Sequence, residues 1–195
     1  MANSAHGGFD GGAVANDGTV EKDINLNISL KLCEMLKLFG YEVIMTRTTD
    51  DATDNTESKV ISDRKKSDLK ERLKIINETK DGVFVSVHLN KFTTSTATGA
   101  QVFYSPNNPM SVELGQSIQK LIVSLLQKDN ERIIKKGNKS TYLLYNAKIP
   151  SVIVECGFLS NNKELSLLKN DDYQSKMAFA IFCGIQEYFN KSGEK

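Results

Sequence analysis

The sequence predicts an α/β fold, a three-layer sandwich in which a mostly parallel central sheet carries helices on both faces. Short apolar and β-branched runs alternate with longer segments in which apolar residues recur every three or four positions. That alternation is typical of a parallel sheet covered by helices. The chain has 195 residues, of which 39 % are hydrophobic and 25 % charged. These values suit an ordinary globular protein, and we expect a single domain spanning 1–195.

The first elements follow from periodicity and flanking residues. An apolar stripe predicts a helix over 24–39, which Gly40 can terminate. The β-branched and apolar run over 41–47 predicts a strand that follows this helix. Residues 48–66 are polar and have no apolar periodicity, so we expect a long exposed loop there.

The alternation continues through the rest of the chain. A helical stripe over 68–79 leads through an Asp-Gly turn into the buried strand expected over 83–90. The remaining predictions are strands over 100–105, 141–145 and 151–155, and helices over 114–125 and 177–189.

The composition excludes several classes of protein. The net charge of +1 argues against a nucleic-acid partner, and the basic cluster Arg132, Lys135, Lys136 and Lys139 is interpreted as a solvated surface. The three cysteines have no CxxC spacing, which indicates buried thiols rather than disulfides or thiolate zinc sites. We find neither a membrane segment nor a signal peptide, so a targeting segment is expected to be absent from this chain.

Four polar residues stand where chemistry is expected. His6 and His88 are the two histidines of the chain, and His88 ends an apolar run, but a lone histidine is more often structural than catalytic. Glu155 ends the run SVIVE. Because burying an unpaired carboxylate costs several kcal/mol, Glu155 should be paired or lie in a cleft, unless it is an exposed strand end. Glu21 could simply place negative charge at a helix N-terminus.

Four ordered segments resemble the zinc-dependent N-acetylmuramoyl-L-alanine amidases, a family that cleaves peptidoglycan. They are HGGFDGGA at 6–13, EKD at 21–23, SVHLN at 86–90 and VECGFLSN at 154–161. The resemblance runs in order over nearly the whole chain. It implies hydrolysis of the amide between N-acetylmuramic acid and L-alanine, with peptidoglycan as the substrate.

The resemblance also implies a catalytic site. Zinc would be held by His6, Glu21 and His88, a three-ligand set that leaves a fourth position for water. Glu155 would be the catalytic acid and base, taking a proton from that water and delivering it to the leaving nitrogen. Arg72 would support the site or contact the substrate. Asn90, two residues past His88 on the same strand face, is expected either to support the site or contact the substrate, or to cap a loop.

The family acts outside the cytoplasm, in the cell wall or the spore cortex. Its compact members include amidases that modify spore cortex for germination, and we expect this chain to be one of them. The family normally has an apolar strand before its first histidine, whereas only five residues precede His6. We therefore expect the first strand to be missing and zinc binding to be weakened or dependent on an activating protein partner.

Two alternatives remain open. Cys156 could act as a nucleophile with His88 as its base, but successive strand residues point to opposite faces, so only one of Glu155 and Cys156 can face the site. The chain could instead be a module that binds peptidoglycan or a partner without turnover, with a weakened metal site. Zinc content and turnover would separate this module from an enzyme.

Overall fold

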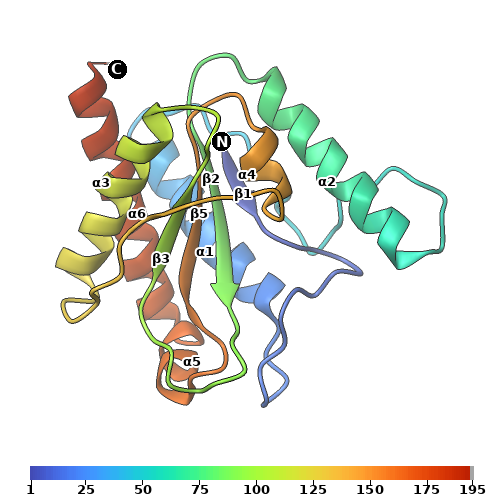
Figure 1. Ribbon diagram of the computed structural model, residues 1–195, viewed down its shortest axis with the longest axis horizontal. Coiled ribbons are helices and arrows are strands. Elements are labelled where there is room, and N and C mark those ends of the chain that lie inside the picture. The colour runs from blue at the N-terminus through green and yellow to red at the C-terminus, as the bar shows by residue number, and fades with distance from the viewer. Residues whose placement is uncertain (194–195) are drawn as a thin grey trace.

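The computed structural model describes residues 1–193, and these residues form a five-stranded sheet with the strand order β1-β2-β5-β3-β4 (Figure 1). Three neighbouring pairs are parallel, and β3 is antiparallel to β5. The predicted mostly parallel sheet is therefore confirmed. Its strands are β1 Ala2–Ser4, β2 Phe84–Asn90, β3 Gln101–Tyr104, β4 Lys135–Lys136 and β5 Ser151–Phe158.

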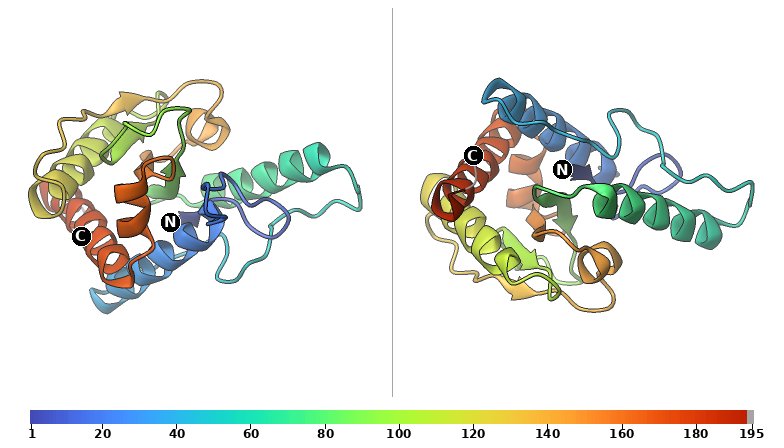
Figure 2. Two further views of the ribbon diagram at one scale, coloured as in Figure 1. Left: turned by 90° about the horizontal axis from the view of Figure 1, so that it is seen from below. Right: turned by 90° about the horizontal axis from the view of Figure 1, so that it is seen from above.

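Helices cover both faces of the sheet, which completes the predicted sandwich. In the views of Figure 2, α1, α3 and α6 lie on one side of the sheet, and α2 and α4 lie on the other. The helices are α1 Glu21–Leu38, α2 Ile61–Glu78, α3 Met110–Leu125, α4 Tyr142–Asn146, α5 Asn162–Leu168 and α6 Asp171–Ser192. Within residues 1–193, none of them is both long enough and apolar enough to span a bilayer.

Alternation along the central strands separates a main core from a more open face. Val85, Val87 and Leu89 of β2 belong to the main core against α1, α3 and α6, as do Val154 and Cys156 of β5. Side chains at the intervening positions point to the opposite face. A smaller cluster around Phe84 and Ile76 covers only the first part of that face, under α2 and α4. The later part of β2 and β5 is left for polar side chains.

The expectation that the first strand is missing is wrong. β1 pairs in parallel with β2, and its other edge is completed by the Ala2 N–H, which donates to the Ile44 carbonyl (3.0 Å). The Asn3 amide donates to Ser86 Oγ (2.7 Å) and accepts from Thr46 Oγ1 (2.7 Å). Three residues suffice because hydrogen bonds satisfy both edges of the strand and the buried Asn3 side chain.

Two predicted strands are also wrong. Residues 41–47 form only an isolated bridge between Met45 and Ala2, because the neighbouring β1 is too short to support a longer ladder. Residues 142–145 belong to helix α4 instead, with Thr141 as its N-cap, and Leu143 and Leu144 are both buried. A short apolar run cannot by itself distinguish a strand from a buried helix. The short elements β4 and α5 have no counterpart among the predictions.

The polar loop after residue 48 is shorter than expected, because α2 begins at Ile61. The early turns of α2 are polar and so give no apolar stripe. They are held instead by bonds to the loop: Arg64 Nε to Asp54 (2.8 Å), and Thr53 Oγ1 to Asp68 (2.7 Å). The loop over 48–60 is therefore fastened along the helix.

Close packing of α3 against α6 makes two glycines unequal. A Cβ at Gly184 would lie 2.5 Å from Ile118 Cα, whereas a Cβ at Gly115 would meet only ordinary contacts at 3.6 Å. We expect Gly184→Ala to lower the free energy of unfolding by about 1–3 kcal/mol through overpacking. Gly115→Ala should be neutral or raise it by up to about 1 kcal/mol through helix propensity. Urea denaturation of both variants tests this, and equal effects would contradict the packing argument.

Candidate active site

The structure brings three predicted site residues together beyond the carboxyl ends of parallel strands. His6 follows β1, His88 lies near the end of β2, and Glu21 begins α1. One ligand atom from each of them lies within 4.8 Å of the others. Carboxyl ends of parallel strands commonly form the sites of α/β proteins. This group could hold a metal ion.

Glu21 lies between the two imidazoles. Its Oε2 is 3.4 Å from His6 Nε2, and its Oε1 is 3.3 Å from His88 Nδ1. The two rings are nearly perpendicular, with centroids 5.5 Å apart. Two imidazole nitrogens and one carboxylate are the donor set of catalytic three-ligand metal sites.

Hydrogen-bond donors surround the buried Glu21 carboxylate. Its Oε2 accepts from the Ala13 N–H (2.8 Å), and its Oε1 accepts from the Leu89 N–H (3.1 Å) and the Asn25 amide (3.1 Å). Burial alone would raise the pKa of this carboxyl, but the hydrogen bonds to the two histidines hold the pKa well below its usual range. The side chain is thus prepared as an anionic ligand.

His6 is held in an unusual backbone conformation, with φ of 60°. Its Nδ1 lies 2.9 Å from Asp10 Oδ2, which leaves Nε2 directed at Glu21. A Cβ at Gly12 would lie 2.6 Å from both the His6 ring and the Glu21 carboxylate, so the glycine is required there. Asp10 was not predicted as a site residue, although it lies within the motif at 6–13.

Arg72 supports the chain that leads to His6. Its side chain is 2 % exposed, and its guanidinium donates to the Ser4 carbonyl (2.8 Å) and the His6 carbonyl (2.9 Å). Asp68 pairs with it at 2.7 Å. Of the two expected roles, burial favours support of the site over contact with substrate.

Glu155 stands directly opposite His88 in the β2–β5 register. Its carboxylate is deeply placed, and Oε2 has no hydrogen-bond partner among the described residues. Burial, partly opposed by His88, raises the pKa of this carboxyl. An uncompensated carboxylate is costly in a protein interior, so this atom is suited to a reacting proton rather than to structure.

Asn90 lies on the same side of the sheet as the site, whereas Cys156 lies on the other side. Asn90 lies two residues beyond His88 on the same face of β2 and is half-buried. Cys156 points into the main core and is fully buried, which raises the pKa of its thiol. Glu155 therefore faces the site, and the thiol alternative is wrong. The expectation of buried thiols holds for Cys33 and Cys156, whereas Cys183 is half-buried.

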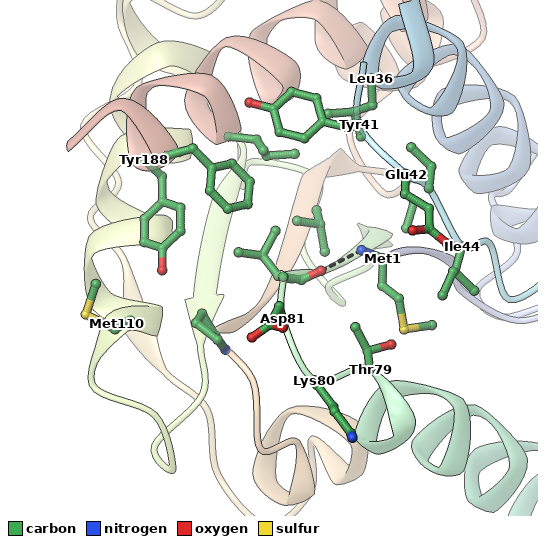
Figure 3. Close-up of a pocket in the computed structure, with 18 of the residues that line it drawn as sticks. Met1, Leu36, Tyr41, Glu42, Ile44, Thr79, Lys80, Asp81, Met110 and Tyr188 are labelled. Carbon is green, nitrogen blue, oxygen red and sulfur yellow. Dashed lines mark hydrogen bonds between the residues drawn. The ribbon is translucent and has the colours of Figure 1, made fainter. Parts of the chain in front are cut away.

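A large cavity lies elsewhere. It has a volume of about 1100 Å³ and is lined by Met1, Tyr41, Glu42 and Asp81, among others (Figure 3). Val83, which precedes β2, also lines it, so the cavity lies at the amino end of the strand whose later part carries His88. It contains none of the predicted site residues.

Binding of a metal should displace a proton from His6. Although burial disfavours the imidazolium, hydrogen bonds to Asp10 and Glu21 raise the pKa of His6 to about 9. A metal requires the neutral ring, so affinity should increase as the pH rises towards 9. We expect release of about one proton per zinc ion at neutral pH, measured by calorimetry in buffers of different ionisation enthalpy. Asp10→Asn should release fewer protons, and a binding enthalpy independent of the buffer would contradict this expectation.

Comparisons with known proteins identify the family that the chain resembles. The family model described as N-acetylmuramoyl-L-alanine amidase, Amidase_3, matches residues 1–187. A germination-specific N-acetylmuramoyl-L-alanine amidase of Bacillus subtilis is 35 % identical over 191 residues, covering 97 % of this chain and 78 % of the relative.

Two solved structures are similar over nearly their whole length. The CwlD amidase of Clostridioides difficile, solved in complex with the GerS lipoprotein, gives a TM-score of 0.93 at 43 % identity and covers 97 % of both chains. An N-acetylmuramoyl-L-alanine amidase of Clostridium difficile 630 gives 0.82 at 31 % identity, covering 98 % of this chain and 96 % of that one. The chain belongs to the N-acetylmuramoyl-L-alanine amidase family, whose members hydrolyse peptidoglycan.

Proposed function

We propose that this amidase is zinc-dependent, with His6, Glu21 and His88 as the metal ligands and Glu155 as the catalytic acid and base. The observation that carries the proposal is the convergence of the three ligand atoms within 4.8 Å, with Glu155 in register opposite His88. The donor set of two nitrogens and one oxygen suits zinc. When bound, zinc supplies Lewis acidity that polarises a carbonyl and lowers the pKa of water.

Glu155 performs the proton transfers in this proposal. Its carboxylate takes the proton of the attacking water and delivers it to the L-alanine nitrogen, because an amine anion is a very poor leaving group. Burial raises the pKa of Glu155, which brings it nearer to the working pH and favours both transfers.

The surrounding residues hold the proposed ligands His6 and Glu21 in position. Asp10 orients the His6 ring, main-chain N–H groups fix Glu21, and Arg72 holds the His6 carbonyl. Such outer contacts typically contribute 10-fold to 100-fold to metal affinity. The alternative of a binding module was based on a missing first strand, and β1 removes that basis.

We further propose that the enzyme acts outside the cytoplasm on spore-cortex peptidoglycan, and that a protein partner activates it. Two similarities support this. The relative of Bacillus subtilis is named germination-specific, and the similar Clostridioides difficile amidase was solved with a lipoprotein bound.

The role of Glu155 can be tested by a conservative substitution. Glu155→Gln keeps the size of the side chain but cannot accept the proton, so we expect kcat on peptidoglycan to fall about 10²-fold to 10⁴-fold. Zinc content by elemental analysis should stay the same. Cys156→Ala is the matched neighbour on the opposite face and should retain turnover. Activity of Glu155→Gln within tenfold of the parent would exclude the proposed role.

The cortex proposal requires a comparison of substrates. We expect muramoyl-alanine bonds in purified spore cortex to be cleaved at least about tenfold faster than those in vegetative sacculi, as seen by release of alanine amino groups. The parent and Glu155→Gln should be assayed in parallel, so that the background rate of the variant can be subtracted. Equal rates on both materials would contradict a preference for cortex.

A further inference from the structure

We propose that Arg132 binds a carboxylate of the stem peptide, on the residue that follows L-alanine. This inference rests on the proposed function, because that function places the scissile amide beside His6, His88 and Glu155. It adds a recognition site for the peptide to the catalytic centre.

Strand register places Gln101 next to the catalytic centre. In the antiparallel β3–β5 pair, Gln101 is directly opposite Glu155, and Glu155 is opposite His88 in the β2–β5 pair. Directly opposite side chains lie on the same face of a sheet. Val102 and Cys156 both belong to the main core, so Gln101 and Glu155 both face away from it. His88, Glu155 and Gln101 therefore form a polar row across three strands.

Arg132 extends this row. Its Nη1 donates to Gln101 Oε1 (3.2 Å), and its Nε donates to the Thr98 carbonyl (2.6 Å). The guanidinium carbon lies 4.7 Å from the centre of the Phe158 ring. Gln101 is itself fixed, because its Nε2 donates to the Ile133 carbonyl (2.8 Å). The half-buried guanidinium is thus held in one orientation before any ligand binds, which suits recognition of a planar carboxylate.

Most other cations near the site are already neutralised. Within residues 1–193, Lys22 pairs with an aspartate at 2.5 Å, Lys65 with Asp10 at 2.8 Å, and Arg72 with an aspartate at 2.7 Å. Over the same residues Arg132 makes no ion pair within 4.0 Å. Lys91 likewise has none, but it is exposed and its ammonium donates to a main-chain carbonyl (2.7 Å).

The nearby Glu164 does not satisfy Arg132. Burial of the Glu164 carboxyl raises its pKa, although the charge of Arg132 lowers it in part. Both Glu164 oxygens, however, accept from main-chain N–H groups, those of Gly99 (2.7 Å) and Phe158 (2.7 Å). A positive charge beside the catalytic row therefore remains for a ligand. Charge-assisted bonds from arginine to a carboxylate are among the stronger hydrogen bonds in proteins.

Substrate chemistry and reach select the ligand. Once the lactyl carboxyl is part of the amide, the two N-acetylated sugars carry no ionisable group, so the negative charge lies on the peptide. Gln101 lies opposite Glu155, at the roughly 5 Å that separates directly opposite side chains. One further hydrogen bond leads from Gln101 to the Arg132 guanidinium. An extended peptide advances about 3.5 Å per residue, so the residue after L-alanine comes to this distance.

The test uses two soluble ligands that differ in one group: N-acetylmuramoyl-L-alanyl-glutamate γ-amide with its α-carboxyl free, and the corresponding compound in which the α-carboxyl is also an amide. Binding is measured by calorimetry on the zinc-loaded Glu155→Gln protein, and turnover on the zinc-loaded parent. We expect the free acid to be preferred at least about tenfold, through a lower Kd and KM. Adding Arg132→Gln should abolish the preference, because it weakens binding of the free acid and leaves binding of the amide unchanged. Arg132→Lys should restore part of the preference.

Lys136→Gln is the control, since it removes the same charge from the exposed neighbouring strand β4. It should leave the preference intact, and thermal unfolding should show that all variants are folded. Equal affinity for acid and amide in the absence of an Arg132 substitution, or an equal loss for both ligands in Arg132→Gln, would overturn the proposal. Preference without turnover in the parent would count against the proposed function, whereas turnover without preference would count against Arg132 alone.

Discussion

The buried carboxylate of Glu21 is the interaction on which the rest of the site depends. It is 3 % exposed, and it is stable there only because main-chain donors and two imidazoles surround it. The donors belong to the loop before α1 and to β2, so the same carboxylate fixes how these segments meet. The path of the glycine-rich loop follows from this constraint, since a side chain at Gly12 would collide with the carboxylate.

The short strand β1 depends on a second set of buried charges. Arg47 and Arg72 donate to the carbonyls of residues 4–6, where the chain leaves the sheet and turns to present the His6 ring. Guanidinium groups suit this role because their several donors have fixed directions. Asp68 compensates one of these charges. Helix α2 thereby participates in positioning a side chain of the active site, although none of its own residues belongs to the ligand group.

The division of the sheet into a closed face and an open face makes room for the chemistry. Helices α1, α3 and α6 seal one face with apolar side chains, whereas α2 and α4 cover only part of the other. The part that they leave uncovered carries His88 and Glu155 side by side. The buried Gln101 connects this pair to the half-buried Arg132. The sheet therefore supplies a rigid support for the proposed catalytic groups.

Elements with a long, regular apolar pattern could be predicted from the amino-acid sequence. The strand over 83–90, the helix that follows Pro109 and the closing helix were all evident, because apolar residues repeat with the period of each structure. The ordered motifs around His6, Glu21, His88 and Glu155 also identified the family. By contrast, β1 has only three residues, and the run over 141–145 suits a helix as well as a strand, so only neighbouring segments could decide them.

Tertiary structure alone decided the contacts between distant parts of the chain. Asp10 against the His6 ring, Arg72 on the His6 carbonyl and Arg132 beside Gln101 each depend on the relative placement of separate segments. Periodicity reports which face of an element is buried, but it carries no information about which polar side chains meet across that face. That choice depends on strand order, register and the satisfaction of buried hydrogen bonds, which are properties of the whole fold.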